Sequence, residues 1–89
     1  MKQKRDCFNL AAKHGIEIVL PAGGWIAGDV IIEVNLPSGF LTDDNTTGYS
    51  LFFDPRDYKM SEIWDVVYAD VQKLVMQKPW AIEKIEVSA

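Results

Sequence analysis

The stretch that decides the fold is DVIIEVNL, residues 29–36. In a β-strand, successive side chains point to opposite faces, so this stretch has two chemically different sides. One side is wholly apolar and carries Val30, Ile32, Val34 and Leu36, and the other carries Asp29, Ile31, Glu33 and Asn35. This alternation predicts a strand of an antiparallel sheet with one face covered by the core.

Two shorter segments repeat the alternation, IEIVL over residues 16–20 and YSLFF over residues 49–53. Their core-facing positions are predicted to be Ile16, Ile18, Leu20, Tyr49, Leu51 and Phe53. Two additions stay open: a short strand at residues 40–41, and a fourth strand in the tail WAIEKIEV, residues 80–87. Acidic and basic residues in that tail suit an exposed sheet edge.

Helices are predicted on both sides of these strands, over residues 4–14 and about 61–78. In the second helix the apolar positions fill one arc of about 140°, which is typical of a helix lying on a sheet. Ser61 is the predicted N-cap, and Pro79 ends the helix. The residues in the arc are Ile63, Trp64, Val67, Tyr68, Val71, Leu74 and Val75.

The element order is therefore α-β-β-β-α, with a possible last strand. It predicts an α+β fold of two layers, in which a three- to four-stranded antiparallel sheet is packed on one face by two helices. The chain has 89 residues and no linker-like segment, so we expect residues 1–89 to form a single domain. The order resembles the double-stranded-RNA-binding domain in topology, and that resemblance rests on element order alone.

The charge pattern disfavours the RNA function of that family. Such domains carry a cluster of lysines at the start of the second helix. Here the corresponding segment reads DYKMSEIWD, residues 57–65, with Lys59 against three acidic residues. The net charge is −4, although residues 1–15 hold four basic residues and one acidic residue. An acidic body argues against nucleic-acid binding, because such binding depends on neutralising phosphates.

Composition also bears on location. No apolar run approaches the ~20 residues that span a bilayer. The basic start MKQKRDCFNL is not followed by the apolar segment of a signal peptide. Cys7 is the only cysteine, so the chain has no internal disulfide. We therefore expect a cytoplasmic protein without a membrane partner.

No catalytic, metal or cofactor motif is convincing. His14 is the only histidine, and Cys7 lies seven residues before it, about 10.5 Å of helix rise away and too far for a hydrogen bond. Residues 43–54 partly imitate a calcium loop, but a strand follows where a helix should, which favours a polar turn. The run GGWIAG is followed by Asp29, which would repel phosphate. We expect no cofactor, no metal and no catalytic residue.

The face of the sheet turned away from the core is the predicted interaction surface. It carries Val19, Ile31 and Phe52 among Glu17, Glu33 and Ser50. A register shifted by one residue would turn this face inward, which is the competing interpretation. Trp25 and Ile26 lie in the glycine-rich stretch PAGGWIAGD, residues 21–29, predicted as a wide hairpin connection. Two interpretations of Trp25 are open: a lid on its own core, or an anchor into a partner.

These observations predict a small non-enzymatic protein-interaction domain that forms a homo-oligomer, most simply a dimer, or binds a protein partner. The predicted interaction residues are Val19, Trp25, Ile26, Ile31 and Phe52.

The alternative is a ligand-binding or enzymatic module with a pocket near Trp25 and polar groups from Asp29, Glu33 or Tyr49. A nucleic-acid-binding domain ranks third because of the acidic charge.

Overall fold

The strand predicted at residues 29–36 is the centre of the main sheet. In the computed structural model, β3 (Asp29–Asn35) pairs antiparallel with β5 (Gly48–Phe53) along one edge. β1 (Glu17–Val19) and β2 (Trp25–Ile26) pair antiparallel with the two ends of β3 along the other edge. The structure describes residues 2–20, 25, 26 and 28–82, with residues 25 and 26 described by their backbone alone.

The pairing register confirms the predicted core face. Ile32 lies opposite Leu51, and Val34 lies opposite both Ile18 and Tyr49. Opposite residues in an antiparallel pair share a face, so these side chains lie together on the helix side of the sheet. Leu20 is an exception to the prediction: it is 38% exposed, because β1 ends at Val19 and the alternation stops there.

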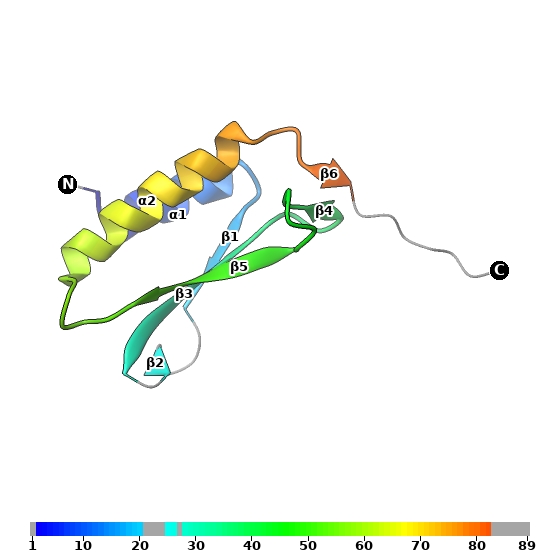
Figure 1. Cartoon of the computed structure of the whole chain (residues 1–89). Coiled ribbons are helices and arrows are strands. Elements are labelled where there is room, and N and C mark those ends of the chain that lie inside the picture. The colour runs from blue at the N-terminus through cyan, green and yellow to red at the C-terminus, as the bar shows by residue number, and fades with distance from the viewer. Residues whose placement is uncertain (1, 21–24, 27, 83–89) are drawn as a thin grey trace.

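Both helices cover this one face (Figure 1). α1 (Lys4–Lys13) buries Cys7 and Ala11, and it ends where Gly15 takes a left-handed backbone conformation with φ of 73°. α2 (Met60–Met76) inserts its predicted apolar arc into the core. The molecule is therefore an α+β fold of two layers, as the element order predicted.

The predicted N-cap of α2 is wrong by two residues. Lys59 is the N-cap, and Ser61 is already inside the helix. The backbone N–H of Lys59 donates to the carboxylate of Glu62 at 3.2 Å, so Glu62 satisfies the amide of the N-cap residue itself. The glutamate also lies at the positive end of the helix dipole, where a carboxylate is favourable.

The segment after α2 forms a second, smaller sheet. β6 (Ala81–Ile82) pairs antiparallel with β4 (Phe40–Leu41) and does not extend the main sheet. Trp80 fixes this arrangement: its indole N–H donates to the carbonyl oxygen of Leu74 at 3.1 Å, and its ring meets that of Phe40 edge-on at 6.0 Å. Residues 83–87 of the predicted tail strand lie outside the described residues.

A pair of neighbouring valines on α2 tests this packing. Val67 is fully buried between helix and sheet, whereas Val66 is exposed. Val67→Ala removes buried methyl groups and leaves a cavity, so we expect a loss of about 2 kcal/mol in the free energy of unfolding. Val66→Ala is the matched control and should change stability by less than about 0.5 kcal/mol. Equal losses in urea unfolding would mean that α2 is docked by a different face.

Candidate interaction surface

The predicted interaction residues of the main sheet lie on one face. Ile31 is directly opposite Phe52, and Val19 is directly opposite Glu33. Because paired residues share a face and alternate residues of a strand do too, Val19, Ile31 and Phe52 all point away from the helices. Ser50, opposite Glu33, lies on the same face.

Their exposure differs greatly. Phe52 is 62% exposed, Val19 is half-buried and Ile31 is only 3% exposed. Ile31 lies on the central strand β3, directly opposite Phe52 of β5. Phe52 lies on the outermost strand, where one side is open. The solvent-facing part of the predicted patch is therefore centred on Phe52.

The other two predicted interaction residues are described by backbone alone. The strands on either side of the glycine-rich stretch, β1 and β3, pair antiparallel as predicted. The stretch is not a connection throughout, because Trp25 pairs with Val30 and Ile26 with Asp29. Their side chains lie outside the described part of the structure, so both interpretations of Trp25 stay open.

The open edge of β5 is a feature that sequence reasoning missed. All of its strand pairing is with β3, and in the described part of the chain no backbone hydrogen bond links residues 48–53 to any other segment. The strand GYSLFF contains no charged residue and no proline, although these are the usual means of protecting an edge. The absence of charge was visible in the sequence, but the position of this strand at an edge was not.

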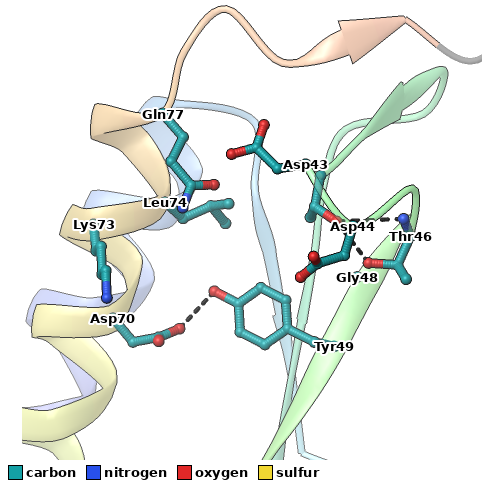
Figure 2. Close-up of a pocket in the computed structure, with 10 residues that line it drawn as sticks. Asp43, Asp44, Thr46, Gly48, Tyr49, Asp70, Lys73, Leu74 and Gln77 are labelled. Carbon is teal, nitrogen blue, oxygen red and sulfur yellow. Dashed lines mark hydrogen bonds between the residues drawn. The ribbon is translucent and has the colours of Figure 1, made fainter.

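A cleft of about 500 Å³ lies between α2 and the turn that precedes β5. Figure 2 shows Tyr49 reaching across it to Asp70, and the hydroxyl donates to the carboxylate at 2.5 Å. Partial burial, followed by the hydrogen bond to Asp70 and its charge, raises the pKa of Tyr49 well above its usual value. Asp29 and Glu33 lie on the opposite face of the sheet, so the three polar groups of the predicted pocket are not brought together.

Residues 43–54 do not form a calcium-type loop. The backbone N–H of Thr42 donates to the carbonyl oxygen of Thr46 at 2.8 Å, and Asn45 takes a φ of 60°, which makes a tight polar turn. Asp54 lies at the far end of β5, where its carboxylate accepts from Arg56 at 2.8 Å. The described residues contain no group of three or more acidic, histidine or cysteine side chains arranged to hold a metal ion.

Cys7 and His14 have separate structural roles. The Cys7 thiol is buried and donates to the carbonyl oxygen of Trp64 at 3.2 Å. Burial raises its pKa to about 11, which leaves little reactive thiolate at neutral pH. His14 caps the end of α1, with its Nδ1 at 3.0 Å from the ammonium of Lys78. Partial desolvation and the nearby Lys78 lower the pKa of His14.

Comparisons with protein-family models, curated proteins and solved structures gave no match. Among the described residues, no helix combines the length and the apolar character needed to cross a membrane.

The Tyr49–Asp70 contact predicts a specific alkaline pH dependence. Below the ordinary tyrosine pKa of 10.0, both folded and unfolded chains keep the phenol proton, so the hydrogen bond contributes fully. Above pH 10 the phenol of Tyr49 ionises first in the unfolded chain. The contribution of the hydrogen bond to the free energy of unfolding then falls, and it is lost as the pH rises through the raised pKa of the folded state. Tyr49→Phe should cost about 1 kcal/mol at neutral pH.

Urea unfolding of both proteins measures the difference. The advantage of the wild type over Tyr49→Phe should be constant up to about pH 10 and shrink above it. An advantage that grows with alkaline pH would contradict the hydrogen bond.

Proposed function

We propose that this chain is a protein-interaction domain that binds a second copy of itself through the sheet face around Phe52. The observation that carries the proposal is the position of Phe52, 62% exposed on the side of the sheet away from the core. Half-buried Val19 lies on the same face and adds to the apolar surface.

Burial of this phenyl ring contributes to the driving force for association. Fully burying a phenylalanine side chain is worth about 1.5–3 kcal/mol, and a two-fold dimer buries the same residue twice. Glu33 and Ser50 on the same face provide the polar rim that interfaces carry around an apolar centre.

The lone cysteine and the lone histidine each make a structural contact. The Cys7 thiol is enclosed in the core, and His14 interacts with Lys78. A single reduced cysteine also suits the cytoplasm, which we propose as the location.

One observation favours the ligand-binding alternative, namely the cleft of about 500 Å³ beside Tyr49. Its lining includes Asp43, Asp44 and Asp70 with Lys73, which would suit a small cationic ligand. A chain that stays monomeric at every concentration would turn attention to this cleft.

Sedimentation equilibrium from about 10 µM to about 1 mM tests the proposal, because this range covers association free energies of about 4–7 kcal/mol. The mass should rise from the 10.0 kDa of one chain towards twice that value. Phe52→Thr keeps the β-propensity but removes the ring, and it should weaken association about tenfold or more.

The matched control is Met76→Gln, which removes an apolar side chain that is 84% exposed on α2. It should leave the association unchanged. A wild-type mass of one chain throughout the range would refute self-association, and equal weakening by both variants would refute the assignment to Phe52.

A further inference from the structure

We propose that two copies associate by antiparallel pairing of β5 with β5, which joins the two sheets into one continuous sheet. The inference rests on the proposed self-association and adds its geometry: contact through a strand edge, with Phe52 covered as a consequence. The partner is a second copy of this chain.

The edge of β5 presents unused hydrogen-bonding groups. A strand at the margin of a sheet directs alternate N–H and C=O groups outward, where they pair with water or with another strand. β5 is six residues long, and in the described part of the chain its backbone pairs only with β3. Strand addition at such an edge is a common mode of protein recognition.

The opposite edge of the sheet is protected by comparison. It is divided between β1, of three residues, and β2, of two. β1 begins with the charged, exposed Glu17. β5 is longer than β1 or β2 and contains no charged residue. The β5 edge is therefore less protected against pairing with another strand.

Two-fold symmetry restricts how β5 can pair with itself. Opposite residues must share a face of the sheet, so the two-fold axis passes between two copies of the same residue. If the register is centred on the strand, that residue is Ser50, Leu51 or Phe52. These registers place Phe52 opposite Gly48, Ser50 or Phe52 of the second copy, all of them outer-face positions. Each register places the second copy beside the exposed phenyl ring, and the register centred on Phe52 covers it most, because the two rings then lie opposite each other.

The paired residues of β5 bring no like charges together in this arrangement, because the strand Gly48–Phe53 contains no charged residue. Exposed Asp43 and Asp44 precede the strand, and Arg56, which follows it, is ion-paired with Asp54 of its own chain at 2.8 Å. These segments lie far apart within one chain, at opposite ends of β5 (Figure 1). Antiparallel pairing leaves the charged segments that flank β5 outside the paired residues, where solvent screens the repulsion between two chains of net charge −4.

Amide hydrogen exchange measured by NMR at two concentrations tests the pairing. In the monomer, alternate amides of β5 face solvent and should exchange rapidly. In the dimer all the amides of the strand's centre should be protected, and dilution should restore rapid exchange at alternate positions. The outward amides of β1 are the internal control and should exchange rapidly at both concentrations.

Ser50→Lys tests the edge with little risk to the fold. Ser50 is exposed and lies opposite Glu33, so a lysine there gains an opposite charge within the monomer. In the dimer it would place two lysines on or near the axis, which should weaken association about tenfold or more. Ser50→Thr and Glu17→Lys are the controls, and both should associate like the wild type.

Three outcomes are distinguishable. A dimer with concentration-dependent protection of β5, disrupted by Ser50→Lys, supports the inference. A dimer whose β5 amides still exchange rapidly overturns edge pairing but leaves self-association through the sheet face intact. A chain that is monomeric up to about 1 mM has an association free energy weaker than about 4 kcal/mol, and this result overturns both proposals.

Discussion

The structure depends on the enclosure of β3. Its helix-facing side chains Ile32 and Val34 are fully buried, and strands pair with it on both edges. Backbone groups removed from water must be hydrogen-bonded, so a buried strand of seven residues requires these neighbours. The apolar stripe of α2 closes the helix side through Ile63, Val67 and Val71. The other elements are arranged around this one strand.

The enclosure is unequal on the two edges. Two short strands, β1 and β2, share one edge of β3, while the continuous strand β5 covers the other. The sheet therefore ends on its β5 side in an unbroken, uncharged strand. The same strand displays Phe52 on its outer face. The exposed ring of Phe52 and the unpaired backbone groups of β5 thus lie on the same strand. One contact with a second copy would bury the ring and pair these groups.

The elements with a strong local signal could be predicted from the sequence. The two-residue period of residues 29–36 fixed which side of β3 enters the core, and the arc of α2 identified its buried face. The prediction also placed Val19, Ile31 and Phe52 on one face, because alternation within each strand determines this regardless of strand order.

Features that depend on neighbours could not be predicted. Ile31 is buried because β3 is central, and strand order is not visible in the alternation. Leu20 continues the pattern of β1 in sequence, but the strand ends before it. β6 pairs with β4 because Trp80 packs against Phe40, a contact between residues forty positions apart. The Tyr49–Asp70 hydrogen bond likewise required the docking of α2 on the sheet.

The most direct test of this account is an isotope-filtered NOE experiment on an equimolar mixture of labelled and unlabelled chains. Signals that pass the filter report only contacts between copies. The account predicts cross-strand Hα–Hα contacts between β5 residues of the two chains, centred on residues 50–52, with Phe52 ring protons close to outer-face residues of the second copy. Contacts confined to β1 or to the helices would contradict it.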